Sequence, residues 1–423
     1  MKSSYTPWRP LWKYLGGTAA SRAGDEMTGP ALLLLGFAVT GRPATGSALL
    51  AGLTIAAAVG GPVFGALLDR SPRPDRVLAL TLSAYAAGII AVAAAMGRVP
   101  VPLVVMIALA AGLFNPAVAG GWTSQLPRIV TGPGLSRGFA LDAMTYSAAS
   151  LAGPALAAVI AAWFGARTAV VTAAVLVALA IPSACSLSRY PPPQADAPRP
   201  APSRQVAAGF AAIVTRRPLL RATVTSAVSY VGLGMLLVCC PLLGAQRLGG
   251  SARGALLISA IAAASLIVNS ILARRPPRSQ PDVRVLVSTL VIGVSMAAAA
   301  LLTTGAPGWL TMAAVALGGA GEGPQLTALF AVRHRESPEH MRGQIFTTAA
   351  SLKIGGLAAG AALAGPLAGR SVTACLLAAA GFELCAAAAY VLIGPPPKAA
   401  RPASRRSGPA ADTMARSESR LLL

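Results

Sequence analysis

Charged residues are scarce in this 423-residue sequence: 11% of its positions are Asp, Glu, Lys or Arg, whereas soluble globular proteins carry about 25%. Hydrophobic residues, by contrast, make up 55% of the chain. This balance excludes an ordinary soluble domain. It favours an all-α integral membrane protein, in which each span needs about 20 consecutive, mostly apolar residues.

Acidic residues are scarcer than basic ones: the chain has 13 Asp and Glu against 35 Lys and Arg, which gives a net charge of +22. Nucleic-acid binding would require the basic residues to gather on one face or arm. Here they fall between apolar runs, so we expect no nucleic-acid partner. The five cysteines lie within apolar stretches, at spacings that fit neither a disulfide framework nor a zinc site.

Histidine is nearly absent, and the two that occur, His334 and His340, lie in one expected loop beside Glu336 and Glu339. A metal site there is poorly specified, and a solvated loop is the favoured interpretation. The sequence also contains no Walker-type loop, HExxH or GxSxG motif. We therefore expect no enzyme activity, no cofactor, no metal and no direct use of ATP.

Apolar runs long enough to cross a membrane occur twelve times. They lie at residues 14–40, 46–68, 77–97, 101–121, 140–163, 167–188, 219–245, 254–273, 284–304, 308–331, 343–368 and 371–393. If the N-terminus is cytoplasmic, 27 of the 35 Lys and Arg residues lie on the cytoplasmic side, six lie on the other, and two lie within spans. By the positive-inside rule, this asymmetry predicts a multi-pass protein of the cell membrane with both termini in the cytoplasm.

Two Pro- and Arg-rich segments interrupt this pattern. The stretch "SRYPPPQADAPRPAPSRQ" at 188–205 cannot build a core and predicts an extended linker, and the C-terminal stretch predicts a disordered tail. The expected organisation is a cytoplasmic N-terminus (1–13), a six-helix bundle (14–188), a cytoplasmic linker (189–218), a second six-helix bundle (219–393) and a cytoplasmic tail (394–423).

The two expected bundles share sequence features. "RGFALDAMTYSAASLAGP" at 137–154 corresponds to "RGQIFTTAASLKIGGLAAGAALAGP" at 342–366, since both open with Arg-Gly and end with Gly-Pro. Pro116 corresponds in the same way to Pro324, and these matches are separated by about 205–208 residues, close to half the chain. The constant offset predicts twelve transmembrane helices arranged as two parallel six-helix repeats.

The stretch "GALLDRSPRPDR" at 65–76 resembles the signature between the second and third spans of the major facilitator superfamily. The matching residues are Gly65, Asp69, Arg70, Arg73 and Arg76, and Pro72 stands where a second Gly is usual. The resemblance implies the fold of that superfamily. In the family this loop braces the cytoplasmic side against the eleventh span, so the five matching residues are the expected cytoplasmic gate.

Two further stretches are similar to proton-driven drug and macrolide exporters of that superfamily. "SLAGPALAA" retains Gly153 and Pro154 of the signature in span five, and "SRAGDEMT" at 21–28 is similar to their first span. Span four lacks the Arg that many proton antiporters carry there. Gly153-Pro154 and Gly365-Pro366 are expected to bend spans five and eleven, because proline removes an intrahelical hydrogen bond.

Arg22, Asp25 and Glu26 lie inside the first span, where a charge is costly unless it is paired, neutralised or placed in a wet cavity. Their spacing permits contacts of Arg22 with Asp25 or with Glu26 along one helix face. One Arg cannot compensate two carboxylates, so we expect the surplus acid to exchange protons or to bind substrate. The alternative is a structural ion pair near the cytoplasmic boundary, with Arg22 reaching the interface.

Three other charges lie within expected spans: Glu322, Lys353 and Glu383. Glu322 and Lys353 are near the middle of neighbouring spans, which predicts a pair that either handles substrate and protons or forms a structural bridge. Glu383 has no obvious partner. Asn115 and Gln325, beside the matching prolines of spans four and ten, could hydrogen-bond substrate or bridge helices.

These features predict a secondary transporter that couples protons to the movement of a small amphipathic compound, such as a drug or secondary metabolite, by alternating access. Export is implied by the resemblance alone. The expected partners are a small-molecule substrate, protons and the lipid bilayer, and we expect a monomer. The alternatives are an importer on the same fold and a non-transporting receptor or scaffold.

Overall fold

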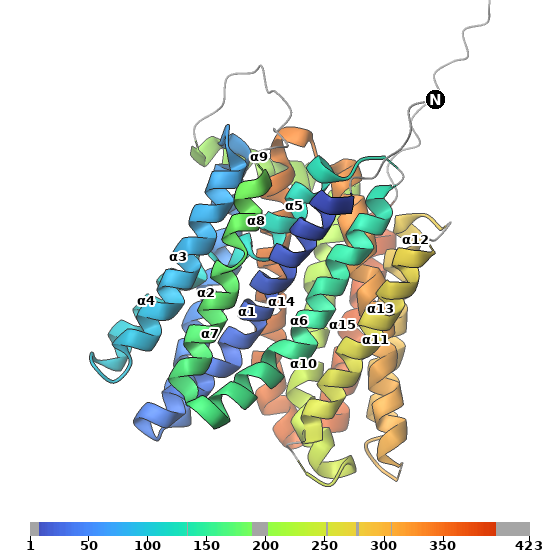
Figure 1. The fold of residues 1–423 in the computed structure, drawn as a ribbon. Helices are drawn as coiled ribbons and strands as arrows, with labels where there is room; N and C mark the ends of the chain where they lie inside the picture. The colour runs from blue at the N-terminus through green and yellow to red at the C-terminus, as the bar shows by residue number, and fades with distance from the viewer. Residues whose placement is uncertain are drawn as a thin grey trace, which may run out of the picture.

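The computed structural model describes residues 8–132, 134–187, 202–250, 253–275, 279–305 and 307–394, and these residues form a bundle of helices joined by short loops (Figure 1). Ten helices in the described part of the chain are long and apolar enough to cross a membrane. Two further long helices, α1 with 33 residues and α13 with 29, are richer in charge and lie in the same bundle. The predicted twelve-helix, all-α membrane fold is confirmed.

The first half of the bundle supplies six of the twelve spans. Its helices are α1 (Trp8–Thr40), α2 (Pro43–Arg70), α3 (Pro74–Ala95), α4 (Val101–Gly112), η1 (Asn115–Ala117), α5 (Gly120–Ile129), α6 (Gly134–Phe164), α7 (Ala166–Ala178) and α8 (Ile181–Ser186). The fourth span is interrupted: α4 ends before Asn115-Pro116, where proline supplies no backbone donor, and α5 continues beyond the predicted end at residue 121.

The second half repeats the order and direction of the first. Its helices are α10 (Arg217–Arg247), α11 (Gly254–Arg274), α12 (Pro281–Leu301), α13 (Gly308–Glu336), η4 (Glu339–Met341), α14 (Arg342–Arg370) and α15 (Val372–Leu392). The sequence repeat is visible in the helix starts, since α3 begins with Pro74-Asp75 and α12 begins with Pro281-Asp282. Proline suits the first position of a helix, and the acid suits its positive end.

Several helices begin or end with arginine at one end of the bundle. There α2, α5 and α13 end near Arg70, Arg128 and Arg335, and α10 and α14 begin with Arg217 and Arg342. We call it the basic end. The two halves meet chiefly where α2 packs on α14 and α6 packs on α11. One hydrophobic core lies within the second half, and the core of the first half extends to Leu326, Phe330 and Phe346 of the second.

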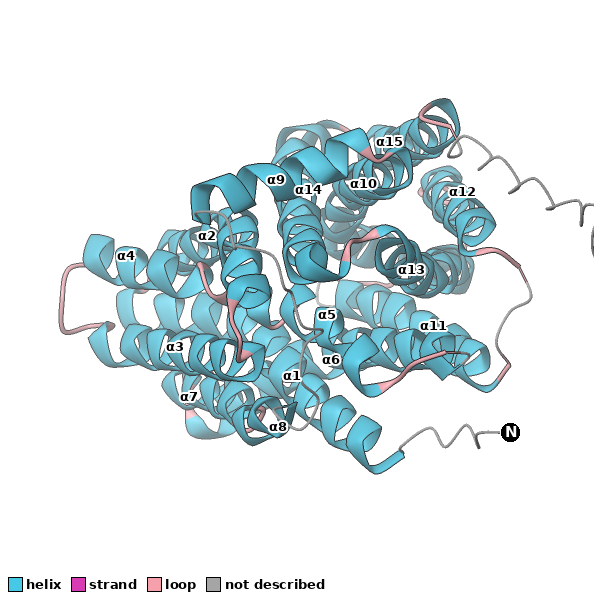
Figure 2. Cartoon of the chain, turned by 90° about the horizontal axis from the view of Figure 1, so that it is seen from above, coloured by secondary structure: helices cyan, strands magenta, loops and turns pink. Residues whose placement is uncertain are grey.

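The segment between the halves is partly helical, so the prediction of an extended linker is wrong for α9 (Pro202–Thr215). No proline occurs within α9 after its first residue, and Val206 and Ile213 bring apolar side chains to one face. Ile213 is buried against Ile345, and α9 lies across the basic end against α2, α10 and α14 (Figure 2). Residues 188–201 and the predicted tail beyond Gly394 lie outside the described residues.

Candidate functional site

Arg22 and Asp142 form a buried ion pair within the first half. Arg22 on α1 is 1% exposed and Asp142 on α6 is 0% exposed. The guanidinium Nη1 lies 3.1 Å from Asp142 Oδ1, and Nη2 lies 3.2 Å from Oδ2. Tyr14 and Thr123 donate their hydroxyls to the same carboxylate at 2.8 Å, and the Tyr146 ring lies 3.5 Å from the guanidinium carbon. Protein groups therefore neutralise both charges.

The predicted contact of Arg22 with Asp25 or Glu26 is therefore wrong. Arg22 turns towards α6 because α1 packs along that helix, and its partner is 120 residues away in the sequence. Sequence reasoning missed Asp142, since it lies just inside the predicted start of span five, whereas α6 already begins at Gly134. An acid in an apolar run indicates that it needs a partner, but the spacing along the chain cannot show that the partner of Asp142 is Arg22.

Asp25 is held by neutral donors. Its Oδ1 accepts a hydrogen bond from Tyr85 Oη on α3 at 2.5 Å and another from Asn115 Nδ2 at 2.6 Å. Asn115 lies at the interruption of span four, so the break brings its amide to the carboxylate. Among the described residues Asp25 forms no ion pair. Its carboxylate can therefore gain or lose a proton without breaking a salt bridge.

Lys353 lies between two tyrosine rings, one from each half. Its Nζ is 5.0 Å from the ring centre of Tyr146 on α6 and 4.6 Å from that of Tyr230 on α10. Among the described residues Lys353 and Glu322 form no direct ion pair: Glu322 accepts a hydrogen bond from Tyr230 Oη at 3.3 Å, and the two charges act on each other only at longer electrostatic range. Glu26 is within electrostatic range of Lys353. The middle of the bundle thus holds one cation, aromatic faces and acids from both halves.

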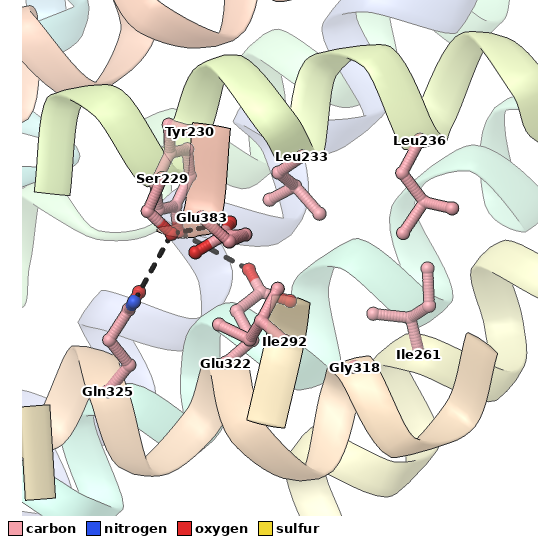
Figure 3. Close-up of a pocket in the computed structure, with 10 residues that line it drawn as sticks. All are labelled: Ser229, Tyr230, Leu233, Leu236, Ile261, Ile292, Gly318, Glu322, Gln325 and Glu383. Carbon is pink, nitrogen blue, oxygen red and sulfur yellow. Dashed lines mark hydrogen bonds between the residues drawn. The ribbon is translucent and has the colours of Figure 1, made fainter. Parts of the chain in front are cut away.

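Gln325 and Glu383 lie on one pocket inside the second half, with Glu322 (Figure 3). Ser229 donates to Glu383 Oε1 at 2.8 Å and accepts from Gln325 Nε2 at 3.2 Å. Gln325 also donates to Thr289 at 2.8 Å. The prediction found no partner for Glu383, and the structure supplies Ser229 from a distant helix.

Asp69 joins the two halves at the basic end. Its Oδ1 accepts a hydrogen bond from the backbone N–H of Gly343 at 2.8 Å, and its Oδ2 accepts one from that of Gln344 at 2.7 Å. These are free N–H groups of the first turn of α14, where a carboxylate also meets the positive end of the helix dipole. A Cβ at Gly65 would collide with α14, so glycine is needed for the close approach. Arg73 is exposed to solvent.

Further contacts between the halves follow α2 and α14 towards the middle of the bundle. Thr347 Oγ1 donates to the Gly61 carbonyl at 2.7 Å, and Ser351 Oγ donates to the Ala57 carbonyl at 2.7 Å. Beside them Phe330 on α13 lies 6.1 Å, centre to centre, from Phe139 on α6. Together these contacts hold the two bundles against each other between the basic end and the middle.

The predicted helix-bending prolines, Pro154 and Pro366, lie within α6 and α14, and both helices continue past them. Gly153 faces Glu26 on α1, whereas nothing packs on Gly365. His334 belongs to α13 rather than to a loop and lies against the Phe139 ring. Within the described residues, no group of three or more His, Cys, Asp or Glu side chains could hold a metal ion.

The fold, with two parallel six-helix halves and ionisable groups between them, defines a secondary transporter rather than an enzyme. The model of the Major Facilitator Superfamily matches residues 14–352, and the chain belongs to this superfamily.

Similar proteins span almost the whole chain. An uncharacterized MFS-type transporter, y4rN of Sinorhizobium fredii, is 27% identical over 395 residues, which cover 91% of this chain and 95% of that protein. A bacterial homologue of the iron transporter ferroportin in an outward-facing state has a TM-score of 0.74 at 15% identity, and the human organic anion transporter MFSD10 has 0.71 at 14%. Both alignments cover 91% of this chain and 99% of the other chain. At these identities the two structures support the fold alone.

Proposed function

We propose that this protein is a proton-coupled exporter of small amphipathic compounds, such as drugs or secondary metabolites. It alternates access between the two sides of the cell membrane by moving its halves against each other. Export and the drug-exporter subclass rest on the resemblance of "SRAGDEMT" and "SLAGPALAA" to proton-driven exporters.

The observation that carries proton coupling is the environment of Asp25. Arg22 pairs with Asp142, which leaves Asp25 with the neutral donors Tyr85 and Asn115. A partly buried carboxylate without a counter-ion is unstable when charged and binds a proton readily. Glu26, one residue further along α1 and nearer to Lys353, is the second candidate for the coupling acid.

The substrate, on this proposal, binds at the middle of the interface between the halves. Tyr146 and Tyr230 offer aromatic faces, while Lys353, Glu26 and Glu322 offer charge. An amphipathic molecule would place its apolar part on the rings and its polar part towards the charged groups. A purely hydrophilic solute would gain nothing from the tyrosines.

Asp69 is the proposed gate, together with Gly65 and the arginines 70, 73 and 76. Its bonds to the N-terminus of α14 join the halves at the basic end, which the positive-inside rule assigns to the cytoplasm. Closure there corresponds to an outward-facing state. Release of Asp69 would let α2 separate from α14 and open the cytoplasmic side.

Uptake of dyes and antibiotics into inside-out membrane vesicles, driven by an imposed proton gradient, tests this proposal. We expect the wild-type protein to accumulate substrate and the variant with Asp25→Asn and Glu26→Gln to lose gradient-driven uptake while keeping its fold. Glu339→Gln, an equivalent exchange at an exposed acid of the basic end, serves as the matched control. The single exchanges then show which acid couples.

Two outcomes would contradict the proposal. Uptake that persists in the double variant would assign Asp25 and Glu26 a structural role. Accumulation in right-side-out rather than inside-out vesicles would instead favour the importer. A protein that moves no compound in either orientation, and whose function is lost on deletion of residues 395–423, would be a receptor or scaffold.

A further inference from the structure

A pocket inside the second half has a composition that substrate transport between the halves does not explain. Glu322, Gln325, Ser229, Tyr230 and Glu383 supply its polar lining. The remaining lining is apolar or glycine, and Leu233, Leu236 and Ile261 lie away from the polar cluster (Figure 3). No basic side chain lines the pocket, although it contains two carboxylates.

Glu383 lies at the buried part of this pocket and is incompletely satisfied. Its side chain is 0% exposed, and its Oε1 accepts the hydrogen bond from Ser229. Its Oε2 has no hydrogen-bond partner. A buried carboxylate oxygen without a donor is costly, so the arrangement requires a proton or a cation at this oxygen.

Glu322 strengthens the requirement for a proton or a cation in this pocket. It is partly exposed, unlike Glu383, and therefore lies on the more accessible side of the pocket. Tyr230 donates a single hydrogen bond to it at 3.3 Å, and Lys353 contacts the Tyr230 ring instead of entering the pocket. Two carboxylates within range of each other in a low dielectric cannot both stay ionised unless a positive charge joins them.

We propose that this pocket binds one small monovalent cation, Na⁺ or a proton, between Glu383 and Glu322. The site rests on the proposed function, in which it would be a second coupling-ion site, separate from Asp25 in the first half. The donors are carboxylate, hydroxyl and amide oxygens, which suit a hard cation and give a soft transition metal no nitrogen or thiolate ligand. Lys353 already acts electrostatically on Glu322, so about one negative charge of the two acids is left to balance, which a single monovalent cation does.

The charges around the pocket favour the same ion. Besides Glu322 on α13, the titratable group facing Glu383 from α10 is Tyr230, and Lys353 on α14 acts across the Tyr230 ring. The charged residues of α12, Asp282 and Arg284, lie in its first turn at the basic end. Entry of one cation therefore meets a net negative pocket.

Thermal unfolding of the full-length protein in lipid nanodiscs tests the site independently of transport. Sodium chloride is titrated against choline chloride at constant ionic strength and alkaline pH. We expect Na⁺ to raise the unfolding midpoint of the wild type by about 3 °C, because an ion that binds only the folded state stabilises it. Glu383→Gln should lose this rise, and Glu339→Gln, the exposed control, should keep it.

Acidification in choline distinguishes the proton. If the wild type gains stability on acidification but not with Na⁺, and Glu383→Gln removes the gain, the bound cation is a proton. The proposal is overturned if neither ion stabilises the wild type, or if Glu383→Gln responds like the wild type. Asp25 is present in both proteins, so the difference between the wild type and Glu383→Gln reports on Glu383 alone; failure here leaves proton-driven transport untouched, and failure of transport leaves the cation site untouched.

Discussion

The two halves share one helix order but compensate their most buried acids, Asp142 and Glu383, differently. In the first half the Arg22–Asp142 pair is neutral, fully buried and surrounded by hydroxyl donors. In the second half Glu322 and Glu383 face a common pocket with no basic residue in its lining. The two halves therefore share the path of the chain, although their buried charges are arranged differently.

The similarity of the halves persists where their helices begin. Asp282, in the first turn of α12, accepts from Arg335 on α13 at 2.7 Å and also pairs with Arg221 on α10. In the first half the repeat places Asp75 in the first turn of α3, within electrostatic range of Arg128. The two halves thus carry the same kind of charge at the basic end and differ in the middle, where the proposed substrate site lies.

The strongest way to test the comparison is to neutralise one buried acid in each half. Asp142→Asn leaves Arg22 buried without its counter-charge, and breaking such a pair costs about 3–5 kcal/mol of folding stability. Glu383→Gln removes a buried charge that has no basic partner, so it should cost less than about 1 kcal/mol or stabilise the protein. Thermal unfolding of both purified variants without added Na⁺ measures the difference.

A double variant, Arg22→Met with Asp142→Leu, controls for the loss of the pair itself. It should recover much of the stability lost in Asp142→Asn, because no charge is left unpaired. Equal losses in Asp142→Asn and Glu383→Gln would show that the two halves do not differ in this respect.

A smaller effect is expected at the gate that joins the halves. Asp69→Asn keeps the shape of the side chain but removes its charge and one of its two acceptor oxygens, so one backbone hydrogen bond is lost, at about 1.5–3 kcal/mol. The population should move towards the state that is open at the basic end. Distances between spin labels at Pro72 and Glu339, both exposed and neither part of the proposed gate, report this shift. An unchanged distance distribution would mean that Asp69 does not hold the closed state.

The fold could be predicted from sequence because apolar runs and their offset depend on composition along the chain. Spans such as 254–273 and 343–368 differ from α11 and α14 by at most two residues at each end. The α9 helix was missed because the prolines before residue 203 dominate that segment, while the packing of Ile213 on Ile345 is tertiary information.

The site was less predictable for the same reason. The ionisable residues of the first span were found, since charge in an apolar run stands out, but their partners were not. Asp25 contacts Tyr85 and Asn115 on two other helices, and Arg22 turns away to Asp142. Only the arrangement of α1, α3 and α6 in space decides which of the available partners each charge meets.

The smallest expected effect is at Lys353, which contacts a tyrosine from each half. Lys353→Met keeps the length of the side chain and removes its charge, so the loss is that of the cation–π contacts, about 0.5–2 kcal/mol. Stability should change by no more than this, and the KM for anionic and cationic test substrates should shift in opposite directions. A KM that is unchanged for both would remove Lys353 from the proposed substrate site.

The gate contact has a consequence for how this protein tolerates variation. Asp69 accepts from backbone N–H groups, so these two hydrogen bonds do not depend on which side chain stands at position 344. Proline is the exception, because it has no backbone N–H to donate. Gly343 is different, since a Cβ there would lie 2.5 Å from Asp69 Oδ1. A library of all substitutions should therefore find the closed state sensitive to almost any change at 343, whereas changes at 344 act through the buried Gln344 side chain and its hydrogen bond to the Val206 carbonyl rather than through Asp69. The contact between the halves thus depends on the carboxylate of Asp69 and on the absence of a side chain at Gly343.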